Sequence, residues 1–145
     1  MKLTAETTID APIGIVWRTF NDPADILKWD QSDDWQTTEV WNDLRVGGNL
    51  KLRLEPKEAG ASFDFVATYT VIEPMRLIEW RTDDDRVVRV AFGETDAGVV
   101  VHQTFDAEPN TALDEQRQDW QGVLDNFARY VTASLSDDKP TSTGV

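Results

Sequence analysis

The 145-residue chain contains no cysteine and only one histidine, His102. The absence of cysteine excludes disulfides, thiolate catalysis and zinc sites built on sulfur ligands. With a single imidazole, transition-metal chemistry would depend on carboxylates alone. We therefore expect no metal site and no cofactor.

Basic residues are also scarce, since 14 Lys and Arg stand against 27 Asp and Glu, for a formal net charge of -13. This charge repels phosphate backbones and anionic lipid surfaces, so we expect no nucleic-acid partner and no membrane partner. The chain has no apolar run long enough to span a membrane, and its first ten residues alternate instead of running apolar. These features predict a cytoplasmic protein without a signal peptide.

Aromatic residues, by contrast, are abundant, with six Trp, six Phe and two Tyr. A chain of this length fits one domain that hides about 68–70% of the surface exposed by the unfolded chain. The rings either build a very bulky core or partly line a cavity. We expect a single domain over residues 1–136 and a disordered polar tail over residues 137–145.

The first thirty residues predict one strand followed by two short helices. Residues 2–10 alternate between apolar and polar side chains, as a half-buried strand does. Pro12 suits the first position of a helix, and apolar residues follow it at helical spacing as far as Phe20. A second short helix with Pro23 near its start is expected to run to Trp29.

Between residues 37 and 106, alternating segments are separated by turn signals such as Gly47-Gly48 and Glu73-Pro74. They predict five or six antiparallel strands, each with one apolar face turned inward. The inward faces are expected to comprise Leu50, Leu52 and Leu54; Phe63, Phe65, Ala67, Tyr69 and Val71; Ile78 and Trp80; Val88, Val90 and Phe92; and Val99, Val101, Gln103 and Phe105.

The segment QDWQGVLDNFARYV, residues 118–131, has a wide apolar face at helical spacing. Its apolar side chains span an arc of roughly 160°, against ~100° for a typical surface helix. This width predicts a helix gripped by a concave surface, and we expect it to run from about Thr111 to Leu135. The inward faces of the strands are the surface against which it packs.

Four segments carry a resemblance to a known family. IDAPIGIVWRTFNDPADILKWD, residues 9–30, is similar to the opening helical hairpin of the START and Bet-v-1-like (SRPBCC) superfamily. DLRVGG at 43–48, ATYTVIEPMRLIEW at 67–80 and DWQGVLDNFARYV at 119–131 resemble the branch related to the activator of the heat-shock protein 90 ATPase. The resemblance covers residues 3–135. It implies an α+β helix-grip fold, in which a curved antiparallel sheet of six or seven strands wraps around a long C-terminal helix.

A helix-grip fold leaves a gap between sheet and helix that side chains can line. Tyr69 and Gln103 would be the polar groups that orient a mostly apolar ligand there. The alternative is that the protein's own rings fill the gap. The predicted ligand-binding residues are Phe63, Phe65, Tyr69, Ile78, Trp80, Val90, Phe92, Val101, Gln103, Trp120, Leu124 and Phe127.

No catalytic constellation is evident in the sequence. Its carboxylates fall in turns or on polar faces, and none is among the inward residues, so no paired acid and base is expected. His102 has the parity opposite to that of Val101, which places its imidazole on the outer face of the sheet. Gly47-Gly48 has neither the spacing nor the lysine of a phosphate-binding loop.

The resemblance implies three candidate functions, although analogy of fold is a weaker guide to function than to structure. The first is binding of a small apolar or aromatic molecule between the sheet and the C-terminal helix. The second is a cyclase-like enzyme that uses the same cavity, with Tyr69 moving a proton. The third is a chaperone-interacting protein, against which the charge of -13 argues if the partner is acidic. We expect the first, in a monomer or weak homodimer.

Overall fold

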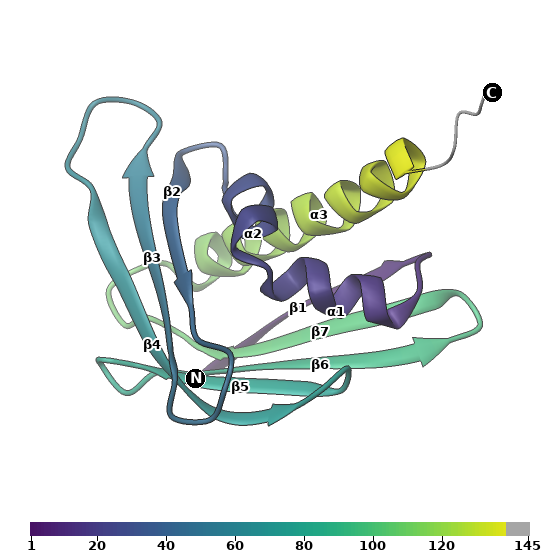
Figure 1. Cartoon of the computed structure of the whole chain (residues 1–145). Coiled ribbons are helices and arrows are strands. Elements are labelled where there is room, and N and C mark those ends of the chain that lie inside the picture. The colour runs from purple at the N-terminus through teal and green to yellow at the C-terminus, as the bar shows by residue number, and fades with distance from the viewer. Residues whose placement is uncertain (139–145) are drawn as a thin grey trace.

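Seven antiparallel strands form one sheet in the order β1-β7-β6-β5-β4-β3-β2, and three helices lie on its concave side (Figure 1). The computed structural model describes residues 1–138. Along the chain the elements are β1 (Lys2–Ile9), α1 (Ile13–Asn21), α2 (Pro23–Trp29), β2 (Trp35–Asn42), β3 (Asn49–Pro56), β4 (Phe63–Glu73), β5 (Leu77–Thr82), β6 (Val87–Thr95), β7 (Gly98–Asp106) and α3 (Leu113–Asp138).

This architecture is the α+β helix-grip fold that the resemblance implies. The sheet bends so that β2 and β3 stand beside α2 and α3, while β5, β6 and β7 pass beneath α1 (Figure 1). The expected order of one strand, two short helices, a run of antiparallel strands and a long C-terminal helix is confirmed. The expected count of six or seven strands is confirmed as seven.

Alternation along β7 shows how side-chain parity divides the sheet into two faces. Val99, Val101, Gln103 and Phe105 are buried, while the residues between them are only half-buried. His102 lies on the outer face, as predicted, with its Nδ1 3.6 Å from Oε1 of Glu6 on the neighbouring strand. The imidazole therefore faces away from the helices.

A β-bulge in β4 changes one predicted inward face. The register with β5 shifts between Tyr69 and Val71, after which Ile72 pairs with Ile78. A bulge adds one residue to one strand and so reverses the parity of the residues that follow it. The prediction that Val71 points inward is wrong for this reason, and Ile72 packs against the core in its place.

Three aromatic rings join the two short helices to α3. The ring centroids of Phe20 and Trp29 are 5.3 Å apart, and that of Phe127 lies 5.3 Å from the first and 4.8 Å from the second. Nε1 of Trp29 donates a hydrogen bond of 3.0 Å to the carbonyl of Thr19, which satisfies the buried indole. Each tilted or edge-on pair contributes about 0.5–1.5 kcal/mol beyond its buried area.

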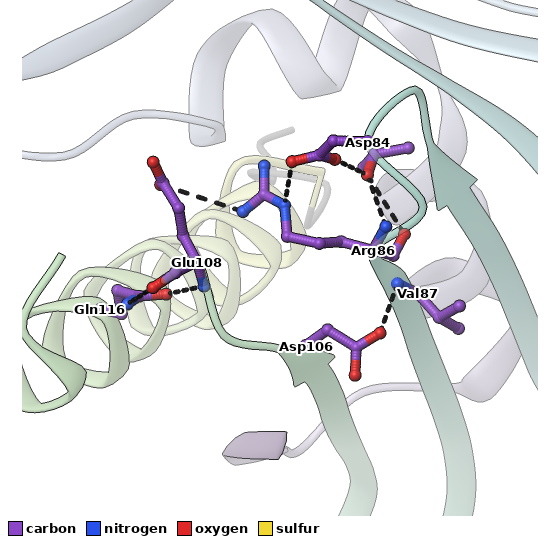
Figure 2. Close-up of polar contacts among 7 residues, drawn as sticks. Asp84, Arg86, Val87, Asp106, Glu108 and Gln116 are labelled. Carbon is purple, nitrogen blue, oxygen red and sulfur yellow. Dashed lines mark hydrogen bonds and ion pairs between the residues drawn. The ribbon is translucent and has the colours of Figure 1, made fainter. Parts of the chain in front are cut away.

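The first turn of α3 is held by the side chain of Gln116 (Figure 2). Its amide accepts a 2.7 Å hydrogen bond from the backbone N–H of Glu108 and donates to the carbonyls of Glu108 and Thr111, both at 2.8 Å. These bonds keep residues 108–112 in a turn, so the helix begins at Leu113 instead of the predicted Thr111. It also continues past the predicted Leu135 to Asp138. The rest of the predicted tail, residues 139–145, lies outside the described residues.

Gln121 ties the middle of α3 to β1, an edge strand of the sheet. Its side chain accepts a hydrogen bond of 3.1 Å from the backbone N–H of Glu6 and donates one of 2.8 Å to the Glu6 carbonyl. The helix is thereby aligned along the edge of the sheet.

None of the helices within residues 1–138 is long and apolar enough to cross a membrane.

Candidate functional site

A cavity of about 190 Å³ lies where β2 to β5 and β7 face α2 and α3. Its wall is largely apolar, with three leucines from β3 and four of the six tryptophans of the chain. The lining residues are Phe20, Asn21, Ile26, Trp29, Asp30, Trp35, Asn42, Leu50, Leu52, Leu54, Phe65, Tyr69, Trp80, Gln103, Asp119, Trp120 and Val123.

Phe65, Tyr69, Trp80, Gln103 and Trp120 lie on the cavity wall, so the structure brings together this part of the predicted site. They come from four elements, β4, β5, β7 and α3. Trp120 also stacks on the core ring of Phe105, with the ring centroids 4.0 Å apart. One face of the Trp120 indole is therefore fixed by packing.

The other predicted residues do not line the cavity. Phe63 has the inward parity but lies at the start of β4 and is 59% exposed. The remainder are buried in the packed core between the sheet, α1 and α3, which fills the other end of the concave face. These are Ile78, Val90, Phe92, Val101, Leu124 and Phe127. The parity of side chains along a strand identifies which residues face the helices. It does not identify where along this inner face the packed core ends and the cavity begins.

Tyr69 belongs to a short chain of hydrogen bonds in which its hydroxyl already has a partner within the protein. Its hydroxyl donates to Oδ1 of Asn42 at 2.7 Å, and Nδ2 of Asn42 donates to the carbonyl of Asn21 at 2.8 Å. Burial raises the pKa of Tyr69. The phenol therefore stays protonated at neutral pH, which does not suit the proton-moving role considered for it.

One buried polar atom of a wall residue has no partner. Nε1 of Trp80 is buried and has no hydrogen-bond partner among the described residues. An unpaired buried polar group costs about 1–3 kcal/mol, so this atom is a candidate for a contact with a bound molecule. Gln103, which is 7% exposed, adds a polar amide to the same wall.

Asp30 places a carboxyl group in the cavity, where none was predicted. It follows the last turn of α2, and its backbone N–H donates to the carbonyl of Ile26. Its Oδ2 accepts a 2.9 Å hydrogen bond from the hydroxyl of Thr37. Burial raises the pKa of Asp30 to about 6, with a smaller increase from Asp119, although the Thr37 bond acts in the opposite direction.

Asp119 on α3 contributes the second carboxyl group of the wall. It is half-buried, and its Oδ2 lies 3.4 Å from Nε1 of Trp35. Burial raises its pKa as well. The prediction that no carboxylates converge inside was wrong because it considered strand parity only. Asp119 lies one helical turn before Val123, at the edge of the apolar face of the helix, and this position was the signal that could have revealed it.

An acidic groove of about 810 Å³ adjoins the cavity and shares Trp35, Asp119 and Trp120 with it. Arg86 is one of its lining residues, with its Nε 2.7 Å from Asp84 and its NH1 3.9 Å from Glu108 (Figure 2). The acidic residues of the groove are Asp33, Asp34, Glu108, Glu115, Asp119 and Asp125, against two arginines, Arg86 and Arg129. Within residues 1–138, no group of three or more His, Asp or Glu could hold a metal ion.

Comparison with known proteins assigns this chain to a family. The family model described as "Activator of Hsp90 ATPase homolog 1-like protein" matches residues 10–132. The chain belongs to this family. Proteins of the family have a Bet-v-1-like fold and commonly bind hydrophobic ligands. No curated protein matches the chain.

Several solved structures are similar to this chain over nearly its whole length. The solution NMR structure of the AHSA1-like protein from Aeromonas hydrophila has 41% identity and a TM-score of 0.84, covering 92% of this chain and 94% of that one. Chr148 from Cytophaga hutchinsonii has 34% identity and a TM-score of 0.79, covering 93% and 94%. Protein CV1439 from Chromobacterium violaceum, at 23% identity, shares the fold with a TM-score of 0.79, covering 89% and 96%.

Proposed function

We propose that this protein binds a small apolar or aromatic molecule in the cavity between the sheet and α3. The observation that carries the proposal is a largely apolar cavity, lined by four indole rings, one of which has an unpaired N–H. An engineered apolar cavity of about 150 Å³ is large enough to bind benzene. A cavity of about 190 Å³ therefore suits a molecule of one or two rings.

Neither alternative function has comparable support. A cyclase-like enzyme was expected to use Tyr69, but its hydroxyl proton is engaged by Asn42. A chaperone-interacting protein would need a docking surface. The large apolar side chains exposed on residues 1–135, such as Trp41, Val46 and Met75, are scattered over separate loops and strands. Single exposed apolar residues of this kind are normal on a protein surface.

The test replaces Phe by Trp at two positions and compares how each change affects the binding of the neutral probe naphthylethanol. Phe65 lines the cavity and is half-buried, so Phe65→Trp places the added volume in empty space. We expect it to abolish binding at a stability cost below ~1 kcal/mol. Phe127 is 0% exposed within the packed core, so Phe127→Trp should cost about 1–3 kcal/mol by overpacking and leave the cavity open.

Binding is measured by titration calorimetry and by the rise in melting temperature with probe concentration, which follows from mass action. Quenching of tryptophan emission provides a third readout, because four tryptophans line the cavity. The proposal fails if neither naphthylethanol nor a library of one- and two-ring aromatics binds the native chain. It also fails if Phe65→Trp leaves the affinity unchanged.

A further inference from the structure

We propose that the ligand is an organic cation, a small aromatic molecule whose protonated amine binds at Asp30 and Asp119. This inference rests on the proposed function and specifies the chemical class of the ligand. Four features of the cavity and its surroundings support it.

The first feature is a pair of carboxyl groups without a counter-ion. Asp30 and Asp119 line the same cavity, and no Lys, Arg or His is among its described lining residues. The hydrogen bonds to their side chains come from neutral groups, the hydroxyl of Thr37 to Asp30 and the indole of Trp35 and the side chain of Ser32 to Asp119. A buried carboxylate is costly unless it is paired. An ammonium group would supply both the opposite charge and three hydrogen-bond donors.

The second feature is the concentration of indole rings around these carboxyl groups. Trp29, Trp35, Trp80 and Trp120 all line the cavity. The face of an indole carries negative electrostatic potential and attracts a cation within about 6 Å of the ring centre. The same rings provide flat apolar surface for the aromatic body of a ligand. A neutral hydrocarbon would use only the flat apolar surface of the rings and not their attraction for a cation.

The third feature is the unused hydrogen-bonding capacity of the wall. Nε1 of Trp80 is buried and has no hydrogen-bond partner among the described residues. Only a ligand that carries a hydrogen-bond acceptor in addition to its ammonium group would satisfy this N–H, because an ammonium group only donates. The side-chain amide of Gln103 lines the same cavity and offers an acceptor for an ammonium group as well as donors.

The fourth feature is the acidic groove beside the cavity. Six carboxylates and two arginines line it, and Asp119 belongs to both the groove and the cavity. A cleft with an excess of charges of one sign raises the local concentration of small ions of the opposite sign. The groove therefore favours the approach of a cation and opposes that of a carboxylate or phosphate ester.

The experiment uses three probes of matched shape, naphthylethylamine, naphthylethanol and naphthylacetate, which are cationic, neutral and anionic at neutral pH. Affinities for the native chain are measured by titration calorimetry at about pH 7.5, where most of Asp30 is ionised. We expect the amine to bind about tenfold or more tightly than the alcohol, because charge-assisted hydrogen bonds are roughly twice as strong as neutral ones. The acetate should bind more weakly than the alcohol.

Three variants test which residues cause the preference for the amine. Asp30→Asn and Asp119→Asn should each reduce the preference for the amine over the alcohol by about fivefold or more while affinity for the alcohol changes little. Asp96→Asn removes the same charge from an exposed turn and should leave the preference intact. It controls for a general effect of net charge.

Each outcome supports or overturns one of the two proposals. If the alcohol binds and the amine binds no more tightly, the cation assignment is wrong and the proposed function stands. The cation assignment is also wrong if the preference for the amine is unchanged in both Asp30→Asn and Asp119→Asn. It is wrong as well if Asp96→Asn reduces this preference as much as those two changes do. If none of the three probes nor the wider aromatic library binds, the proposed function itself is wrong.

Discussion

Replacing Asp30 by Asn should stabilise the protein at neutral and alkaline pH. Burial raises the pKa of Asp30 from 3.8 to about 6 in the folded state, so ionising this carboxyl group opposes folding. Asparagine has nearly the same shape and stays neutral, and its side-chain oxygen can still accept the hydrogen bond from Thr37. The variant removes the cost of ionisation without removing the contact.

The magnitude follows from the difference between the two pKa values. A change from 3.8 to about 6 corresponds to a full effect on the order of 3 kcal/mol. Asp30 as a whole residue is only half-buried, so we expect a smaller gain of roughly 1–3 kcal/mol from the substitution. In a domain of this size, 1 kcal/mol changes the melting temperature by about 3–5 °C.

The dependence on pH identifies the mechanism. A group whose pKa is raised on folding binds its proton more tightly in the folded state, so its ionisation cost is absent below pH 3.8 and complete above about pH 6. The native chain should therefore lose stability relative to Asp30→Asn as the pH rises through this interval. The gain from the substitution should be small near pH 4.5 and largest near pH 8.

Urea denaturation at both pH values, followed by circular dichroism, measures this gain directly. Asp96→Asn, in an exposed turn, is the control and should show no such dependence. An equal gain at both pH values, or a loss of stability near pH 8, would refute the reasoning. Either result would mean that the Asp30 carboxyl group is solvated in the folded protein.

Other substitutions give equally direct tests. Gly122→Ala should raise the free energy of unfolding by about 0.5–1 kcal/mol in urea denaturation, because the added Cβ meets nothing within 4 Å and alanine favours the helix. Gln116→Ala should cost about 2 kcal/mol and increase amide hydrogen exchange in residues 108–112, because it removes three hydrogen bonds; unchanged exchange would contradict the role assigned to Gln116. His102→Ala should leave the affinity for naphthylethanol unchanged in calorimetry, and a threefold loss would show that the outer face of β7 contributes to the site.

Alternation of side chains was sufficient to predict the inner face of most strands, because strand geometry ties parity directly to side-chain direction. The face of β7 was predicted correctly at Val99, Val101, Gln103 and Phe105 for this reason. A bulge has no comparable signal, since the alternation of β4 continues in the sequence past the shifted register at Val71.

The cavity was harder to predict than the sheet that forms it. Phe65 and Phe127 both face inward, yet one lines the cavity and the other is packed among aromatic rings. The difference depends on how far α1 and α2 cover the concave face, which is a property of tertiary packing. Asp30 escaped prediction because a residue after a helix has no parity, and its burial depends on β2 folding over it through Thr37.

The hydrogen bonds between Gln121 and Glu6 also affect how this protein meets copies of itself. An edge strand exposes backbone donors and acceptors that another chain can use to extend the sheet, which is a common start of aggregation. The Gln121 amide occupies one outward-facing N–H and C=O pair of β1, as a neighbouring strand would. A second chain can add to β1 at Glu6 only after displacing this side chain. One glutamine on a helix thus protects the middle of the open edge against the growth of an intermolecular sheet.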